Sequence, residues 1–236
     1  MKKKTIASQT SLDKTLIASV RAGDVDRVKD SLIAGADIHA QDDYALCYSA
    51  ESGHLEVTRV LLDNGADVHA ENDYALRMAS INGHTEVARL LLDNGADVHP
   101  FNDSALRVAS LNGCVELVRI LLDNGANIHA ENDYALCFAS LNGHLEVVSA
   151  LLGGGADVLA AGNRALRNSV ANGHSDVAML LVALGADLEV GIRDSKGQKD
   201  HRMFDMLNQV KNSREEKNIL LAEMPAPGRG DNKPRM

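Results

Sequence analysis

Residues 73–98 read DYALRMASINGHTEVARLLLDNGADV, and this stretch decides the fold. Small and apolar residues recur in it at the spacing of a helix as far as Gly83. A glycine can end a helix because it can adopt positive φ. The small and apolar residues recur again over residues 87–92 as far as Gly95. We therefore expect a helix, a turn and a second helix, followed by an extended run, Ala96 to His99, that leads into the next unit.

The same pattern recurs along the chain with a step of 30 residues. A unit of this size cannot cover its own apolar face, but stacked neighbours can bury a continuous core. The sequence therefore predicts an all-α solenoid of stacked helix-turn-helix units. Three sets of residues repeat at this step. They are Gly23, Gly53, Gly83, Gly113, Gly143 and Gly173; Gly35, Gly65, Gly95, Gly125, Gly155 and Gly185; and Leu16, Leu46, Leu76, Leu106, Leu136 and Leu166.

Two runs of letters resemble the ankyrin repeat. They are Gly53-His54-Leu55-Glu56-Val57 and Leu61-Leu62-Asp63-Asn64-Gly65-Ala66-Asp67-Val68, with their copies. The resemblance covers about residues 13 to 190 and is specific because it recurs in phase. The 30-residue step with the run ENDYALR is also similar to the ankyrin paralogues of giant viruses that infect amoebae. The family resemblance implies a module that binds a macromolecule, with short finger loops between the units.

The chain departs from the family pattern in two ways. An ordinary ankyrin repeat has 33 residues, and the three that are missing here fall in the finger, which should therefore be shorter. The Thr-Pro-Leu-His run of the family is replaced by Tyr74-Ala75-Leu76-Arg77 and its copies, so the hydrogen bonds of that Thr and His cannot form in the same way. We expect Asp73, Asp103 and Asp133 to cap the first helices instead.

The pattern divides the chain into five parts. Residues 1–12 are expected to be a flexible N-terminus, and residues 13–42 an N-terminal capping repeat with a more charged outer face. Residues 43–190 should form five repeats. Residues 191–224 should form a C-terminal helical cap, and residues 225–236, rich in Pro, Gly and charge, a disordered tail.

Two weaker expectations concern the C-terminal half. Gly153-Gly154-Gly155 replaces Asp-Asn-Gly at the end of a second helix, so this junction should be the softest part of the stack. In the cap, apolar residues between Met203 and Val210 suggest one helix, and Ile219 to Leu221 lie on another.

Composition limits the classes of partner. The formal net charge of −9 argues against nucleic acid, because contact with phosphates needs Lys and Arg. No window approaches ~18 consecutive apolar residues, so no membrane span is expected. The start lacks the apolar region of a secretory signal. Three cysteines without a CxxC motif suit a reducing compartment. We expect an intracellular, cytoplasmic monomer, or a protein of the host cytoplasm if its source is viral.

No catalytic group or cofactor is expected. The run Asp67-x-His69-x-Glu71-x-Asp73 carries metal-ligand residue types, but it recurs in each finger and most simply has a structural or solvated role. Cys47 and Cys137 occupy a repeat position that elsewhere holds arginine, and neither has an activating base in its motif. The sequence therefore argues against an enzyme and predicts neither a metal nor another cofactor.

The candidate binding residues follow from the family resemblance, which implies that partners touch the finger tips and the two residues before Gly-His on the concave face. Ile81, Leu111 and Leu141 would form an apolar stripe there, and a contiguous exposed apolar patch marks a binding surface. Packing of these side chains against the fingers is the alternative. The full candidate set is Tyr44, Glu51, Tyr74, Ile81, Phe101, Leu111, Tyr134 and Leu141.

The predicted function is recognition of a protein partner, directed at a host protein if the viral resemblance holds. Two alternatives stay open. A self-associating scaffold would form concentration-dependent oligomers. A substrate adaptor of the ubiquitin-ligase type would need a second docking module, and residues 188–236 show no F-box-like or BTB-like stretch.

Overall fold

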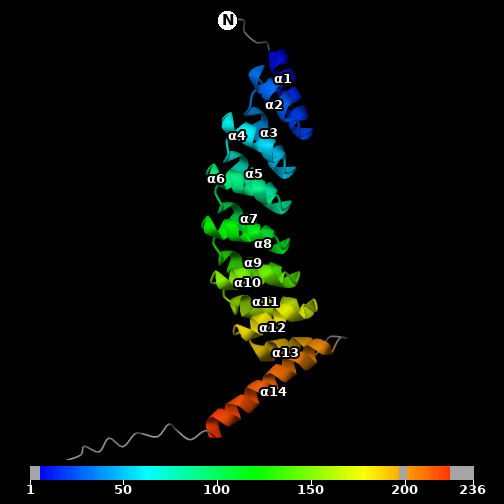
Figure 1. Ribbon diagram of the computed structural model, residues 1–236, viewed down its shortest axis with the longest axis vertical. Helices are drawn as coiled ribbons and strands as arrows, with labels where there is room; N and C mark the ends of the chain where they lie inside the picture. The colour runs from blue at the N-terminus through cyan, green and yellow to red at the C-terminus, as the bar shows by residue number, and fades with distance from the viewer. Residues whose placement is uncertain (1–5, 197–200, 224–236) are drawn as a thin grey trace, which may run out of the picture.

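The computed structural model describes residues 6–196 and 201–223, and every regular element within these ranges is a helix (Figure 1). The helices follow one another in pairs, stacked along one axis. They are α1 (Ile6–Arg21), α2 (Val25–Ile33), α3 (Ala40–Glu51), α4 (Leu55–Asp63), α5 (Ala70–Ile81), α6 (Thr85–Asp93), α7 (Pro100–Leu111), α8 (Val115–Asp123), α9 (Ala130–Leu141), α10 (Leu145–Gly153), α11 (Ala160–Ala171), α12 (Ser175–Ala183), α13 (Leu188–Ser195) and α14 (Arg202–Glu223).

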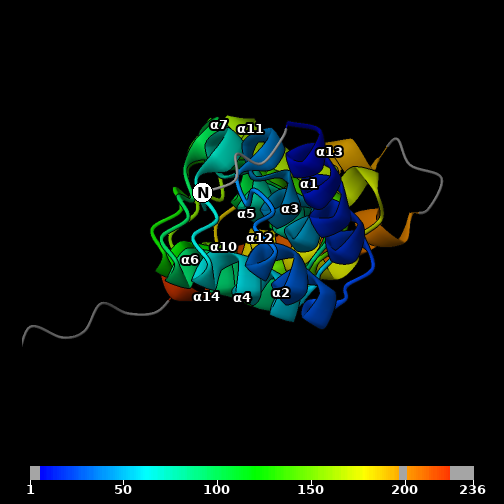
Figure 2. The same ribbon diagram turned by 90° about the horizontal axis from the view of Figure 1, so that it is seen from above.

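The pairs form two columns. Viewed along the stack, the first helices of the pairs, α1 to α11, lie in one column, and the second helices, α2 to α12, lie in the other (Figure 2). Each first helix packs against its own second helix and against the first helices of the neighbouring pairs. This arrangement confirms the predicted all-α solenoid.

The core is a column of leucines between the layers. At equivalent repeat positions, a leucine in each first helix from α1 to α11 and in each second helix from α4 to α12 has a relative accessibility of 1% or less. Alanines at the helix contacts, such as Ala79 and Ala109, let the layers approach closely and are also fully buried. A chain without tryptophan can therefore bury its apolar surface in thin, repeated layers. The leucines are Leu16, Leu46, Leu61, Leu76, Leu91, Leu106, Leu121, Leu136, Leu151, Leu166 and Leu181.

The shortened finger is a left-handed turn. Glu71, Asn72 and Asp73 have φ of 52°, 54° and 55°, and the corresponding three residues of the other repeats have the same conformation. This region costs L-residues about 1–2 kcal/mol each, least for Asn and Asp. The expected extended run Ala96 to His99 is wrong at its last residue, because His99 has φ of −83° and ψ of −19° in the right-handed helical region. The left-handed residues follow after one intervening residue.

The aspartate that ends each left-handed turn closes its own repeat. The buried Asp73 carboxylate accepts a hydrogen bond from the backbone N–H of Asp97 at 2.8 Å and lies 3.1 Å from the His69 Nδ1 atom. Equivalent backbone bonds of 2.8–2.9 Å recur in six units, from Asp13 with Asp37 to Asn163 with Asp187. The prediction that these aspartates cap the first helices is wrong, because their carboxylates bind the loop 24 residues further on.

Histidines at the starts of the second helices join neighbouring repeats. The ring of His84 lies against Gly53, where an added Cβ would come within 2.6 Å of it. Its Nε2 atom lies 3.0 Å from the Glu51 carbonyl oxygen, so the ring bridges two repeats. Gly53 has φ of +72°, so both its backbone conformation and this close approach require glycine.

The two ends of the stack differ from the expected boundaries in detail. Helix α1 begins at Ile6, inside the segment expected to be flexible. Helix α13 takes the place of a seventh first helix beside α11, and α14 runs obliquely across the end of the stack (Figure 1). The two helices expected within residues 203–221 are one continuous helix, α14. Residues 1–5, 197–200 and 224–236, including the expected tail 225–236, lie outside the described residues.

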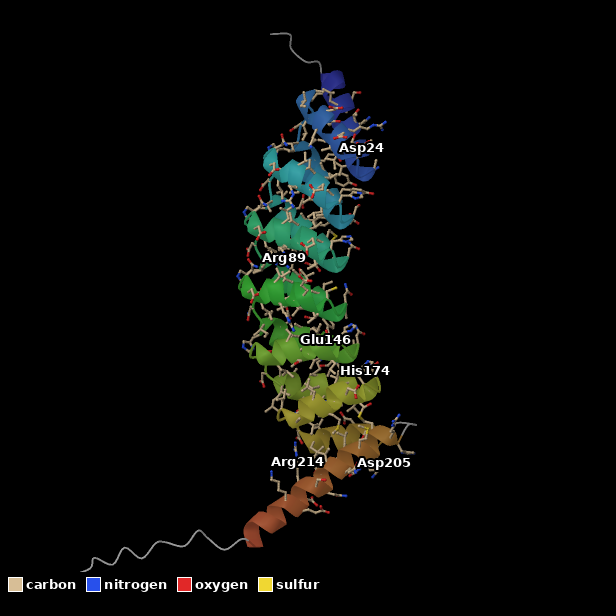
Figure 3. All side chains as sticks on the ribbon, viewed as in Figure 1. Asp24, Arg89, Glu146, His174, Asp205 and Arg214 are labelled. Atoms are coloured by element: carbon tan, nitrogen blue, oxygen red, sulfur yellow. The ribbon has the colours of Figure 1, made fainter. Side chains whose placement is uncertain are left out.

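The cap at the C-terminal end is anchored by its apolar side. Met203 and Leu207 of α14 are buried, and Leu207 reaches Gly191 of α13. Arg214 donates a hydrogen bond to the Val182 carbonyl oxygen at the end of α12 (Figure 3). Helix α14 therefore covers the apolar end of the last repeat, as a solenoid requires.

Candidate protein-binding face

The candidate residues all lie on the first helices or on the turns that precede them. We call this surface the first-helix face, and it consists of the exposed parts of α3, α5, α7, α9 and α11 with their left-handed turns. The sequence reasoning assigned the same positions to the concave side of the stack. The candidates on it are Tyr44, Glu51, Tyr74, Ile81, Phe101, Leu111, Tyr134 and Leu141.

The apolar positions before Gly-His are unequally exposed. Ile81 is 39% exposed, whereas Leu111 and Leu141 are only partly exposed. The backbone carbonyls at these positions accept hydrogen bonds from the following repeat. Leu111 O, for example, accepts from Asn142 Nδ2 at 2.8 Å and lies 2.9 Å from His144 Nε2. The repeat-to-repeat bonds therefore fix the position of the residues that would line a binding surface.

Phe101 and Tyr74 are brought together by an arginine. The Cζ atom of Arg77 lies 4.9 Å from the centre of the Tyr74 ring and 4.3 Å from that of Phe101. Phe101 is 55% exposed, which is unusual for a large apolar side chain. Stacking on aromatic faces is a property of the planar guanidinium, so Arg77 holds both rings in a fixed arrangement.

Two other arginines repeat this arrangement from different positions of the repeat. Arg164 Cζ lies 4.4 Å from the centre of the Tyr134 ring. Arg21 Cζ lies 5.9 Å from the ring centre of Tyr44 and 5.4 Å from that of Tyr48, and Arg21 Nη2 donates to the Tyr44 hydroxyl. Tyrosines on the first-helix face are therefore paired with cations of the chain itself.

Sequence reasoning missed the partners of these rings. Arg77, Arg21, Tyr48 and Arg164 were not among the candidate residues. Tyr48 could have been noticed, since the same repeat position holds Met78 in the next unit. The contacts of Arg77 with Phe101, of Arg164 with Tyr134 and of Arg21 with Tyr44 could not, because they cross between repeats.

The polar run considered as a metal site has structural contacts. The carboxylate of Asp67 accepts the backbone N–H of His69, and the His69 ring pairs with Asp73. Glu71 is exposed on the turn and no ion pair is formed by its carboxylate among the described residues. Within residues 6–196 and 201–223, no group of three His, Cys, Asp or Glu side chains is arranged to hold a metal ion.

The two cysteines of the first helices are buried, and burial disfavours their thiolate forms. Burial raises the pKa of the Cys47 thiol to about 11, with further contributions from the Asp43 and Glu71 charges. Burial also raises the pKa of the Cys137 thiol to about 11. Because the thiolate is the nucleophile, these two side chains act as apolar fillers at a position that is arginine in neighbouring repeats.

The second helices carry a row of surface ion pairs. Arg89 lies 3.8 Å from Glu86 on its own helix and 2.8 Å from Glu116 on the next (Figure 3). Arg59 lies 3.7 Å from Glu56. Exposed pairs of this kind contribute about 0–1 kcal/mol, so this face provides a control surface for binding experiments.

Comparison with known proteins establishes the family. The family model described as ankyrin repeats (3 copies) matches the chain at residues 16–102, 71–133 and 106–192. These overlapping matches span well over half of the 236 residues. The chain therefore belongs to the ankyrin-repeat family. No curated protein sequence matches the chain.

Membership defines the general class of activity. Ankyrin repeats form protein–protein interaction modules and are typically non-catalytic. Among the described helices, none is long and apolar enough to cross a membrane. A protein partner is therefore the class of ligand that the family indicates.

Proposed function

We propose that this chain binds a partner protein through the concave side of the stack, with the first-helix face as the contact surface. The observation that carries the proposal is the row of aromatic rings and arginines on that face. Two apolar side chains on the same face, Ile81 and Phe101, are exposed. Tyr, Phe and Arg are enriched in protein interfaces, and rigid aromatic anchors bind at low entropic cost.

The test is a comparative capture with three baits, the natural chain and two variants. In the first variant, Ile81, Leu111 and Leu141 are all changed to Asp. In the control, Glu56, Glu86 and Glu116 of the second helices are changed to Lys. We expect the natural chain and the control to retain the same proteins and the first variant to lose them, because charges at the centre of an interface are strongly unfavourable.

A single substitution controls for unfolding of the triple variant. Leu111 and Leu141 are partly buried, so aspartate there also lowers stability, and circular dichroism must show that the triple variant is helical. Ile81→Asp alone changes a side chain that is already 39% exposed. If Ile81→Asp and the folded triple variant both retain every protein that the natural chain retains, the first-helix face is not the contact surface.

We further propose a host protein as the partner, and the host cytoplasm as the place of binding. Support comes from the resemblance of the 30-residue step and the ENDYALR run to ankyrin paralogues of giant viruses. The test is capture from amoebal lysate against capture from bacterial lysate. Specific retention from the bacterial lysate alone would contradict this part of the proposal, while oligomers on sizing columns would favour a self-associating scaffold.

A further inference from the structure

An internal comparison of the repeats identifies a slot for arginine. In the second and third repeats, the guanidinium of Arg77 fills the space between the ring of Tyr74 on its own helix and the ring of Phe101 on the next turn. The positions of Arg77 and Phe101 recur at each junction between repeats. What fills the space there depends on the residues at these two positions.

The equivalent space between the first and second repeats holds no arginine. Cys47 stands at the position of Arg77, and its short side chain is buried. Glu71 stands at the position of Phe101. The result is a surface cavity of about 280 Å³. Its lining consists of Gln41, Asp42, Tyr44, Cys47, Tyr48, Glu51, Glu71 and Tyr74.

The fourth repeat shows how the same vacancy is filled elsewhere. Cys137 again replaces the arginine, but Arg164 of the next repeat lies over the Tyr134 ring at 4.4 Å. At the cavity, the residue in the place of Arg164 is Tyr74, which adds a ring instead of a cation. Arg21 approaches Tyr44 and Tyr48 from α1 and is not part of the cavity lining.

The charge of the cavity favours a cation. Asp42, Glu51 and Glu71 are exposed carboxylates at its lining, and no described residue forms an ion pair with any of them. A ring-lined space flanked by carboxylates is suited to a group that is planar, cationic and rich in N–H donors. A guanidinium has all three properties, whereas an ammonium is a compact, strongly hydrated point charge.

We propose that this cavity receives an arginine side chain of the partner protein. The inserted guanidinium would enter the cavity beside Tyr44, Tyr48 and Tyr74, whose rings also contact Arg21 and Arg77 of the chain itself. It would donate hydrogen bonds to Glu51 and Glu71. It would occupy the place that Arg77 occupies one repeat further along. This inference deepens the proposed function and rests on it, because it names the chemistry of one side chain in the partner.

The direct test is an NMR titration of the full chain with the blocked tripeptide acetyl-Gly-Arg-Gly-amide. We expect saturable shifts of the backbone amides of Tyr44, Cys47 and Tyr74, with binding in the millimolar range. The same peptide with citrulline, the neutral isostere of arginine, should bind about tenfold more weakly or not measurably, because it lacks the charge. Equal binding of the two peptides, or no localised shifts with arginine, would overturn the inference.

Variants locate the bound side chain. Cys47→Arg places at this position the residue that Arg77 and Arg107 provide in neighbouring repeats, so it should fill the slot and abolish the peptide shifts. Glu71→Gln should weaken binding by about threefold to tenfold through loss of one charge. Glu131→Gln, at the same position two repeats further along, should leave binding unchanged. Unaltered peptide binding in both Cys47→Arg and Glu71→Gln would contradict the assignment of the cavity, and Glu71→Gln serves alone if Cys47→Arg does not fold.

The two proposals fail in different ways. If the peptide does not bind but protein capture still depends on Ile81, Leu111 and Leu141, the arginine inference is wrong and the proposed function stands. If the arginine peptide binds at the cavity while capture is unaffected by the concave variants, the first-helix face is not the contact surface for the captured proteins, and the proposed function is wrong although the cavity binds a guanidinium.

Discussion

At the scale of single residues, the buried aspartates do two tasks at once. Each accepts a backbone N–H that closes its repeat, and the four in the middle of the chain also hold a histidine of the preceding turn. Asn163 performs the first task without the second, since its Oδ1 atom accepts the Asp187 N–H at 2.8 Å and Leu159 stands in place of the histidine. The chain therefore contains its own control for the effect of the charge.

This control gives a prediction about pH. The hydrogen bond and charge of Asp43 raise the pKa of His39 above its ordinary value of 6.5, with smaller contributions from Asp37 and Asp67. A raised folded pKa means that the stabilisation by protonated His39 is complete below about pH 6.5. It is lost as the pH rises through the raised value.

The measurement is an NMR titration of the His39 ring. In Asp43→Asn the amide oxygen should keep the bond to the Asp67 N–H, as Asn163 does, while the pKa of His39 falls back toward 6.5. The stability lost between pH 6 and 8 should shrink in the same variant. A His39 pKa that does not change on removal of the Asp43 charge would show that the pairing is not the cause.

At the scale of helices and their junctions, the histidine that bridges two repeats is absent once. Cys114 stands in place of His84 and its copies, and the carbonyl of Ile81 is reached only by Asn112 Nδ2, at 2.7 Å. One repeat later, the carbonyl of Leu111 is contacted by both an asparagine and a histidine, so the two partners are compatible.

Restoring the histidine should therefore stabilise the chain. Cys114→His should place a ring against Gly83 and add a hydrogen bond to the Ile81 carbonyl, worth about 0.5–1.5 kcal/mol in the free energy of unfolding. Urea denaturation of the natural chain and the variant measures the difference. His84→Cys, the matched reverse change, should lower stability by a similar amount, and a destabilised Cys114→His variant would refute the proposed role of the ring.

The same scale shows what sequence could and could not predict. Helix pairs and their ends followed from Gly83, Gly95 and the apolar spacing, because these depend on contacts within one repeat. The contacts of the Asp73 carboxylate could not be predicted, because it meets His69 and Asp97 only through a left-handed turn. That turn contains Glu71, a residue without special preference for left-handed backbone. The candidate positions on the face could be predicted from the repeat pattern, whereas the contact of Arg77 with Phe101 depends on the distance between repeats.

At the scale of the whole molecule, stability is the sum of repeats and of the junctions between them. The fifth repeat lacks the His–Asp pair, because it has Leu159 and Asn163, and the helix before it ends in Gly153-Gly154-Gly155. We therefore expect amides of α10 and α11 to exchange with solvent faster than those of α5 and α6 in hydrogen-exchange mass spectrometry.

A repaired variant tests the cause of this weakness. Leu159→His with Asn163→Asp supplies the pair that the other repeats have, and protection of α10 and α11 should rise. Equal protection of all repeats in the natural chain would contradict the expected soft junction, and faster exchange in the repaired variant would contradict its explanation.

The central claim also belongs to this scale: one side of the stack is the binding surface. Site-specific photo-crosslinking tests it most directly, with benzoylphenylalanine at Leu111 on the first-helix face or at the exposed Arg119 on the second helices. The account predicts that the Leu111 probe crosslinks to a partner protein and the Arg119 probe does not. Crosslinks from Arg119 alone would place the binding surface on the opposite side of the stack and contradict the account.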